Sequence, residues 1–305
     1  MSMVDLSVKL RNLTLKNPIL LASGTVGYGQ EIAEFTDLNK IGGVVTKSLS
    51  LKPRKGNPPQ RIVETPSGML NAIGLANVGV DEFLRSKIGF FKDYDTALIC
   101  NIAASTPEEY LECVRILDSE ERIDGFEINV SCPNVKDGGL EFGNNPAMVS
   151  KITNLTRGAT KKFLTIKLSP NVARISDFAR IAKEEGADAV SAINTLVGTS
   201  FDIYSRKPKI RNITGGLSGP AIKPVALAKV LEIRRNVDIP VIGLGGISVW
   251  QDVVEFMIAG AAAVQLGTIN FINPDSGVNF LSGLTDFCNL QKIDSISQLT
   301  GSFTL

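Results

Sequence analysis

Eight short apolar runs, separated by stretches of strand-plus-helix length, constrain the fold of this chain more than any other feature. Each run stops at a polar residue or a glycine. A short continuous apolar run is what a strand buried on both faces requires. The runs are Ile19–Ala22, Val44–Thr46, Ala97–Cys100, Phe126–Val130, Leu164–Ile166, Ala189–Ile193, Val241–Leu244 and Ala263–Leu266. Buried strands alternating with helices are typical of α/β folds.

Amphipathic stretches of helical length lie between several of these runs. Thr106 is the expected cap of one helix, with Pro107 in its first turn, and Ser176 or a neighbour should cap another. Gly186 and Gly260 are expected to stop two of the helices. The predicted helices are Pro107–Asp118, Ile175–Glu185, Pro224–Arg235 and Val249–Ala259.

The alternation predicts a single (β/α)8 TIM barrel, one domain over residues 1–305. Two connections are longer, residues 48–77 and residues 196–219, and both follow strand ends. We expect them to be inserted segments at the C-terminal face, where barrel active sites lie. A doubly wound open sheet is the alternative, but Gly24, Gly27 and Gly29 give the wrong order for its dinucleotide fingerprint. We interpret these glycines as a strand-end turn.

The chain contains no histidine. This excludes Ser-His-Asp triads, His-metal sites and imidazole chemistry, so acid–base catalysis must use Cys, Lys, Asp, Glu or Tyr. The net charge is only +1, so the chain does not have the excess of positive charge that is typical of proteins that bind nucleic acids or anionic membranes. The N-terminal residues have no apolar core of signal-peptide type, and no run reaches about 18 apolar residues. We therefore expect a soluble cytoplasmic protein with no nucleic-acid or membrane partner.

The four cysteines are Cys100, Cys113, Cys132 and Cys288, and no two form a Cys-x-x-Cys pair. This spacing argues against a metal site or an iron–sulfur cluster built from this chain alone. We interpret Cys100, Cys113 and Cys288 as small buried hydrophobes. Cys132 has polar neighbours, and the glycine-containing segment Asn134–Gly143 that follows suits a mobile lid. Cys132 is a candidate proton acceptor or covalent nucleophile.

Polar residues and glycines end the predicted strands, and in a barrel these ends converge on one mouth. They include Ser23, Lys47, Ser48, Asn101, Asn129, Lys167, Asn194, Thr195, Gly245, Gly246, Gly267 and Thr268. Amides and lysines suit a ligand with many carbonyls and ring nitrogens and an anionic group. The glycines after the last two strands occupy the usual phosphate position of this fold. The alternative is that they only make tight turns.

Lys167 and the segment Gly68–Leu75 are the features whose roles the residues leave open. An unpaired ammonium is costly to bury at the end of an apolar strand. Lys167 is therefore a candidate for a Schiff base, a structural ion pair, or a contact with the pyrimidine end of a flavin. The segment Gly68–Leu75 is mostly apolar and needs to be covered, so we expect it to pack against a ligand or a subunit interface.

Several of these segments together resemble the class 1 dihydroorotate dehydrogenases, and within them the class 1B catalytic subunit. The match runs from Asn17 to about Asn273. Its most specific pieces are Gly68–Leu75, Asn129–Asn134 (NVSCPN), Gly215–Pro224 (GGLSGPAIKP), Gly245–Ile247 and Val264–Thr268 (VQLGT). The resemblance implies oxidation of dihydroorotate to orotate in de novo pyrimidine biosynthesis. Cys132 would take the C5 proton while hydride leaves C6 for the flavin N5.

The resemblance also implies where FMN and the substrate bind. FMN would be held by Ser23, Lys47, Ser48, Asn101, Asn129, Lys167, Ile193, Gly219, Gly245, Gly246, Gly267 and Thr268. The substrate would lie among Lys47, Asn71, Ala72, Ile73, Gly74, Leu75, Asn129, Asn194 and Thr195. The chain departs from the family pattern at Thr199, where a methionine is expected, and at Ala76 and Val78. These departures concern fine substrate or interface contacts.

The electron acceptor is inferred from the same resemblance. A class 1B subunit passes electrons to NAD through a partner subunit with FAD and a [2Fe-2S] cluster, in a heterotetramer around a catalytic homodimer. The segment 135–139 resembles class 1B. One alternative is a class 1A-like homodimer that reduces fumarate directly. Two further alternatives are a Schiff-base lyase that uses Lys167 and a barrel that serves only as a binding module.

Overall fold

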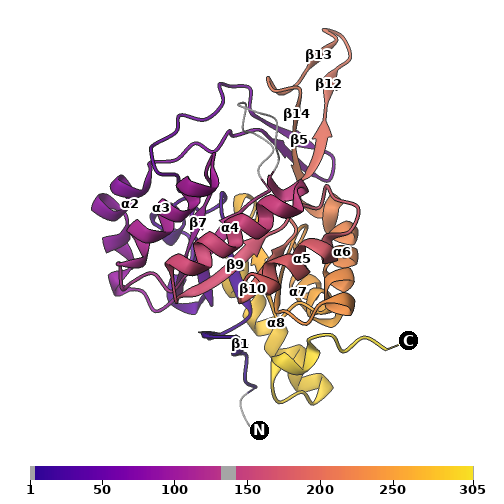
Figure 1. The fold of residues 1–305 in the computed structure, drawn as a ribbon. Coiled ribbons are helices and arrows are strands. Elements are labelled where there is room, and N and C mark those ends of the chain that lie inside the picture. The colour runs from indigo at the N-terminus through magenta and orange to yellow at the C-terminus, as the bar shows by residue number, and fades with distance from the viewer. Residues whose placement is uncertain (1–3, 132–141, 305) are drawn as a thin grey trace.

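Eight parallel strands close into a barrel in the computed structural model, which describes residues 4–131 and 142–304 (Figure 1). In chain order they are β3 (Ile19–Leu21), β4 (Gly43–Val45), β7 (Ala97–Ile102), β8 (Gly125–Asn129), β9 (Phe163–Lys167), β10 (Ala189–Ala192), β15 (Val241–Leu244) and β16 (Ala263–Leu266). Each pairs in parallel with the next, and β16 pairs with β3 to close the ring. The predicted (β/α)8 TIM barrel and its eight strands are confirmed, and the open-sheet alternative is wrong.

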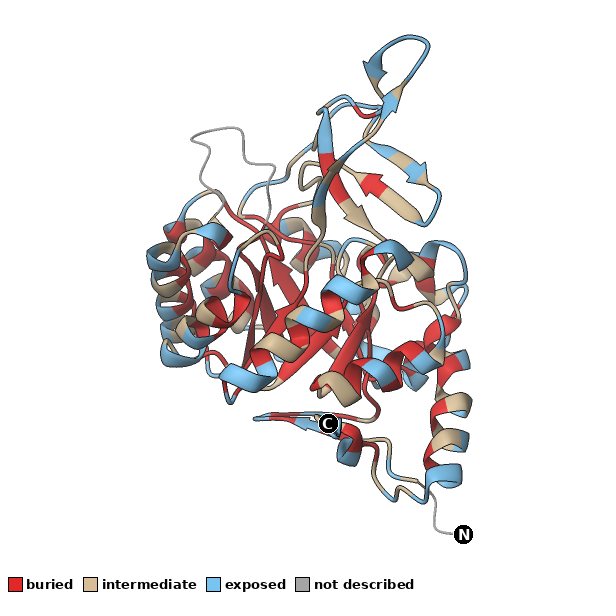
Figure 2. Ribbon diagram, turned by 90° about the vertical axis from the view of Figure 1, so that its right-hand side faces the viewer, coloured by how far each residue is buried: buried red, intermediate tan, exposed pale blue. Residues whose placement is uncertain are grey.

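Helices surround the barrel and cover the outer faces of its strands, which are almost wholly buried (Figure 2). The α-helices are α1 (Gln30–Ala33), α2 (Val80–Ser86), α3 (Pro107–Asp118), α4 (Pro146–Ala159), α5 (Ile175–Glu184), α6 (Lys223–Asn236), α7 (Trp250–Ala259) and α8 (Ser276–Gln291). Short 3-10 helices are η1 (Leu38–Lys40), η2 (Ile88–Asp93), η3 (Phe142–Asn144), η4 (Pro220–Ile222), η5 (Thr268–Phe271) and η6 (Ile296–Leu299). Within the described part of the chain, none of these helices has the length and apolar character to cross a membrane.

The four helices predicted from the sequence are confirmed as α3, α5, α6 and α7. Thr106 caps α3 as expected, because its hydroxyl oxygen accepts a hydrogen bond from the amide of Glu109 at 3.2 Å. Gly186 and Gly260 follow α5 and α7 with φ of 93° and 123°. These left-handed conformations favour glycine and end the helices as predicted.

The predicted cap of α5 is wrong. This helix follows Arg174 and has no side-chain cap. Ser176 is buried, and its hydroxyl donates a hydrogen bond to the Glu232 carboxylate of α6 at 3.0 Å. The Ser176 hydroxyl, which the sequence pattern assigned to capping, therefore hydrogen-bonds to a carboxylate of the neighbouring helix instead.

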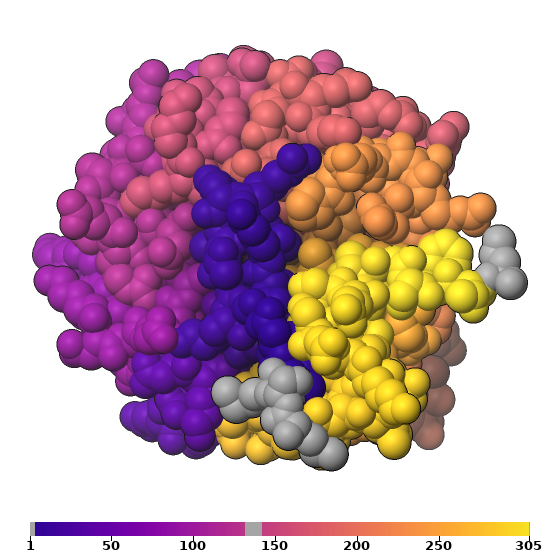
Figure 3. Space-filling view, turned by 90° about the horizontal axis from the view of Figure 1, so that it is seen from below, coloured from indigo at the N-terminus to yellow at the C-terminus, as the bar shows by residue number. Residues whose placement is uncertain are grey.

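An N-terminal hairpin covers the barrel at the amino ends of its strands. Strands β1 (Val8–Leu10) and β2 (Leu13–Leu15) pair antiparallel, and the side chains of Leu10 and Leu15 are buried. Figure 3 shows the indigo N-terminal residues running across this face beside the yellow C-terminal region. The opposite end of the barrel, at the carboxyl ends of the strands, is where the inserts lie.

Both long connections form inserts, as predicted, and they combine into one antiparallel sheet. We call it the roof sheet; its strands, in order, are β11 (Leu196–Thr199), β14 (Thr214–Ser218), β6 (Gly68–Asn71) and β5 (Ile62–Thr65). Leu70 of β6 is paired with Leu217 of β14, which joins the first insert to the second. Leu70, Ala72 and Ile210 form a small apolar core of their own. The roof sheet stands over the carboxyl ends of the barrel strands (Figures 1 and 2).

The second insert also carries a short hairpin that projects beyond the roof sheet (Figure 1). It consists of β12 (Phe201–Asp202) and β13 (Lys207–Pro208). Ile203 and Tyr204 at its tip are 76% and 90% exposed. Exposed apolar side chains grouped in this way are typical of a surface that contacts another protein.

Three of the cysteines are buried, as predicted. Cys100 and Cys113 lie within the apolar packing of the barrel, and Cys288 lies on α8. Burial raises the pKa of the Cys113 thiol to about 12 and also raises the pKa of the Cys100 and Cys288 thiols. Because the thiolate is the reactive form, these three thiols suit packing and not chemistry.

Candidate active site

A cavity of about 430 Å³ lies between the carboxyl ends of the barrel strands and the roof sheet. It is lined from below by strand ends and from above by Asn71, Gly216 and Ser218 of the roof sheet. Most of the predicted site residues meet there: Ser23, Lys47, Ser48, Asn71, Ile73, Leu75, Asn129, Lys167, Ile193, Asn194, Thr195, Gly219, Gly245, Gly246, Gly267 and Thr268. Residues far apart in the sequence thus form one site.

Four predicted residues are not part of the described cavity wall. Ala72 is buried in the apolar core of the roof sheet. Gly74, with φ of 74°, packs against Asn57. Asn101 lies beneath the cavity, inside the barrel. Cys132 is outside the described residues, as is most of the predicted lid Asn134–Gly143.

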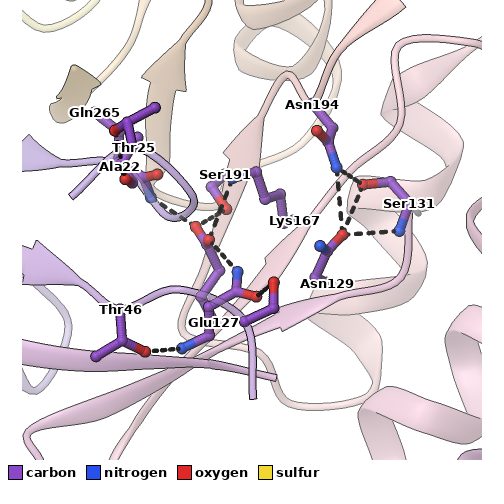
Figure 4. A network of polar contacts seen from close by, with 12 residues as sticks. Ala22, Thr25, Thr46, Glu127, Asn129, Ser131, Lys167, Ser191, Asn194 and Gln265 are labelled. Carbon is purple, nitrogen blue, oxygen red and sulfur yellow. Dashed lines mark hydrogen bonds and ion pairs between the residues drawn. The ribbon is translucent and has the colours of Figure 1, made fainter. Parts of the chain in front are cut away.

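A buried polar network lies in the barrel directly beneath the cavity (Figure 4). Its centre is Glu127 of β8, which is fully buried. The Glu127 carboxylate accepts hydrogen bonds from Asn101 Nδ2 at 2.7 Å, Ser191 Oγ at 2.7 Å and Gln265 Nε2 at 2.6 Å. These donors come from three other strands, β7, β10 and β16. The network thereby fixes side chains from opposite sides of the barrel.

Lys167, at the end of β9, pairs with this carboxylate. Its Nζ lies 3.4 Å from Glu127 Oε1, and its side chain is 7% exposed. Lys167 also lines the cavity, whereas Glu127 does not. The ion pair that the sequence left as one of three roles is therefore present, and the ammonium still faces the cavity from below.

Two asparagines at the mouth are held in fixed orientations by Ser131 (Figure 4). The Asn194 amide donates to Ser131 Oγ at 2.6 Å and to Asn129 Oδ1 at 3.3 Å. The Ser131 hydroxyl and amide also donate to Asn129 Oδ1. Because the oxygen of Asn129 is engaged, its NH₂ group is left as the donor for a ligand carbonyl or carboxylate.

Lys47 is the second lysine of the cavity and follows β4. Burial lowers its pKa, the positive charge of Arg61 lowers it further, and the carboxylate of Glu31 partly opposes both. Arg61 comes from the first insert, also lines the cavity, and donates a hydrogen bond to the Asn57 carbonyl at 3.0 Å. Two cations near one wall of the cavity favour an anionic ligand there.

The glycines after β15 and β16 also line the cavity. Within the described residues, the backbone N–H groups of Gly245, Gly246, Gly267 and Thr268 donate no hydrogen bond to another protein group. A Cβ added at Gly267 would meet only the Ala22 side chain, at 3.9 Å. Free amides beside open space are typical of the phosphate sites of this fold.

Comparison with known proteins identifies the family. Residues 5–287 match the sequence profile of a family described as dihydroorotate dehydrogenase. This chain belongs to the dihydroorotate dehydrogenase family. Among its relatives, a protein of Pelobacter propionicus is 51% identical over 98% of each chain. Proteins of Geotalea daltonii and Bacteroides fragilis are 48% and 46% identical over nearly their full length. Each is named dihydroorotate dehydrogenase B (NAD(+)), catalytic subunit.

Sequence reasoning missed several residues that the structure places at or beneath the cavity, among them Glu127, Gln265, Ser218 and Arg61. Glu127 and Gln265 each interrupt an otherwise apolar strand, and this polar interruption was a usable signal. Ser218 lines the cavity because β14 pairs with β6, which no local pattern predicts. Arg61 lies in a segment rich in proline and glycine that carries no periodic signal.

Proposed function

We propose that this chain is the catalytic subunit of an enzyme that oxidises dihydroorotate to orotate, with FMN held in the cavity. The observation that carries the proposal is the convergence of Lys47, Lys167 and Asn129 with two glycine-containing turns on one cavity. In a chain of the dihydroorotate dehydrogenase family, this set matches a ligand with a phosphate, ring carbonyls and an adjacent anionic substrate.

The cavity residues fit FMN. The free amides of Gly245, Gly246, Gly267 and Thr268 suit its phosphate, and the open space at Gly267 admits a ligand atom where a side chain would stand. Lys167 suits the pyrimidine end of the ring, because a positive charge there stabilises the reduced, anionic form. When bound, FMN supplies the acceptor for the hydride that leaves C6 of the substrate.

The remaining residues hold the substrate and move its proton. The NH₂ of Asn129 and the ammonium of Lys47 donate to the ring carbonyls and the carboxylate of dihydroorotate. Ser131 fixes Asn129 and Asn194 before the substrate arrives, which lowers the cost of orientation. Cys132, next to Ser131 in the sequence, takes the C5 proton as its thiolate.

A Schiff-base role for Lys167 is disfavoured by its ion pair. A nucleophilic lysine must be neutral, and such lysines are activated by desolvation or by a neighbouring positive charge. Lys167 instead lies 3.4 Å from a carboxylate, which stabilises the ammonium. The flavin contact and the ion pair are compatible, because an ammonium has three donors.

We infer that electrons leave the chain through a partner subunit with FAD and a [2Fe-2S] cluster, and reach NAD. The names of the relatives, which specify a catalytic subunit and NAD, support a separate electron-transfer subunit. The exposed apolar tip of the β12–β13 hairpin supports a homodimer within such a heterotetramer.

The test compares the chain purified alone with the chain co-expressed with its partner. We expect a yellow protein whose flavin is bleached by dihydroorotate in both samples, and NAD reduction only in the second. Robust fumarate reduction by the chain alone would overturn the NAD-linked assignment. A colourless protein that borohydride traps on a carbonyl substrate would overturn the flavin assignment and favour a lyase.

A further inference from the structure

Glu127 is a buried charged residue to which the reaction above assigns no role. It is 0% exposed. It accepts hydrogen bonds from Asn101, Ser191 and Gln265 and pairs with Lys167. All of the groups that face it donate, which matches a carboxylate, since an ionised carboxylate only accepts.

Stability alone does not account for this network. Removing a carboxylate from water costs several kcal/mol, and well-packed apolar residues of similar volume often stabilise a protein as well or better. Most buried residues of the barrel are apolar, among them Ile128 and Ile166, the neighbours of Glu127 and Lys167 in the sequence. We therefore expect the buried charge of Glu127 to have a function that an apolar side chain could not perform.

The network reaches the ligand through Lys167 and Gln265. Both line the cavity, whereas Glu127 lies behind them and Asn101 lies beside it. Lys167 gives one of its three hydrogens to Glu127 Oε1 at 3.4 Å and keeps the others for the cavity side. Glu127 is thus placed to act on a bound ligand only through the residues in front of it.

We propose that Glu127 is a positioning residue that holds the Lys167 ammonium at the flavin, and so favours the reduced, anionic flavin. This inference rests on the proposed function, because it takes FMN as the ligand. Lys167 is 5% exposed, and a buried charge requires a paired opposite charge and hydrogen bonds to be held in place. Without Glu127, the Lys167 ammonium would lose the partner that holds it at the position where it opposes the negative charge of the reduced flavin.

The experiment measures the two-electron midpoint potential of the flavin bound to the full-length chain. We compare wild type, Glu127→Gln, Lys167→Gln and the double variant at one neutral pH. Glu127→Gln is expected to weaken binding of the reduced relative to the oxidised flavin at least tenfold, a shift of about 30 mV to more negative potential. In the Lys167→Gln background, Glu127→Gln is expected to change the potential little, because Glu127 acts through Lys167.

A control variant separates this role from general stability. Asp188→Asn weakens the ion pair with Arg157, just before β10 and outside the Glu127 network. It is expected to lower the thermal stability of the protein and to leave the flavin potential at its wild-type value.

The outcomes distinguish the two proposals. A wild-type chain that binds no flavin or leaves dihydroorotate unoxidised overturns the proposed function itself. A flavin-loaded wild type with an unchanged or more positive potential in Glu127→Gln overturns only the role of Glu127. If Glu127→Gln does not fold, Glu127→Asp decides: it shortens the side chain and is expected to shift the potential in the same direction, and a wild-type potential would contradict the proposal.

Discussion

The hydroxyl of Thr268 donates a hydrogen bond to the Ser218 hydroxyl at 2.8 Å, joining the end of the last barrel strand to the roof sheet. Both residues line the cavity, one from the barrel and one from the roof sheet. The bond therefore lies between the two parts of the structure that enclose the ligand. Its loss is expected to loosen the cavity more than the fold.

Thr268→Val tests this connection, since valine has nearly the shape of threonine. Losing one hydrogen bond is expected to cost about 1 kcal/mol of stability and to weaken FMN binding several-fold. Thermal unfolding and a fluorescence titration with FMN measure the two effects. Thr285→Val is the matched control, because the Thr285 hydroxyl donates to the Leu281 carbonyl within α8. Equal FMN affinity in both variants would contradict the expectation.

Gly267→Val tests the open space beside the last barrel strand. A Cβ added at Gly267 would meet only Ala22, at 3.9 Å, so there is space for a side chain at this position. We expect a folded protein whose affinity for FMN falls at least tenfold, because the valine methyl groups occupy ligand space. Gly158→Ala in α4, where a Cβ meets nothing within 4 Å, should instead raise stability by about 0.5–1 kcal/mol and leave FMN binding unchanged.

Lys47→Met tests the lysine whose pKa is lowered by burial and by Arg61. Between that lowered pKa and the ordinary value of 10.5, the unfolded chain binds more protons than the folded one, so wild-type stability rises with pH. The variant removes this penalty and should unfold at a higher temperature than wild type at neutral pH, in the absence of ligand. The difference should shrink as the pH approaches 10.5.

The same variant should bind the substrate poorly. Loss of a charge-assisted hydrogen bond costs about 1.5–3 kcal/mol, so KM for dihydroorotate is expected to rise about ten- to hundredfold. Steady-state kinetics measure KM, and melting curves across pH measure stability. A variant less stable than wild type at neutral pH would show that Lys47 is paired in the free protein.

Cys132→Ala tests the proposed proton acceptor, which lies outside the described residues. Removing a general base is expected to lower kcat by about 10²–10⁴ while FMN remains bound. Cys132→Ser should recover part of the lost rate as the pH rises, because a hydroxyl is harder to ionise than a thiol. Flavin bleaching by dihydroorotate, followed by stopped flow across pH, measures the step. A wild-type rate at neutral pH in either variant would exclude Cys132 as the base.

Much of the fold could be predicted because the barrel strands are buried on both faces. Runs such as Ile19–Ala22 and Ala97–Cys100 are apolar throughout, and such runs can be recognised in the sequence alone. The polar residues that end these runs, such as Lys47 and Asn194, also meet at the cavity as expected. At these strand ends, the positions predicted from the sequence pattern agree with the positions in the structure.

What could not be predicted depends on contacts between distant segments. The pairing of Leu70 with Leu217 is set by how the two inserts meet above the barrel, not by either segment alone. Asn129 ends β8, whereas Asn101 lies within β7 and is paired in register with Glu127, two residues before Asn129. Asn101 therefore lies beneath the cavity, where its amide donates to the Glu127 carboxylate. Ser176 was misassigned for the same kind of reason, through Glu232 on a neighbouring helix.

The roof sheet joins two segments whose hydrogen-bonded residues, Asn71 and Gly216, are 145 positions apart. A fragment that holds only the first four barrel strands therefore lacks half of the cavity ceiling, and a fragment that holds the last four lacks the other half. Binding of a ligand in this cavity thus reports that both halves of the barrel have come together. Two separately expressed halves of the chain would bind flavin and become yellow only after they assemble, so flavin binding would measure their assembly.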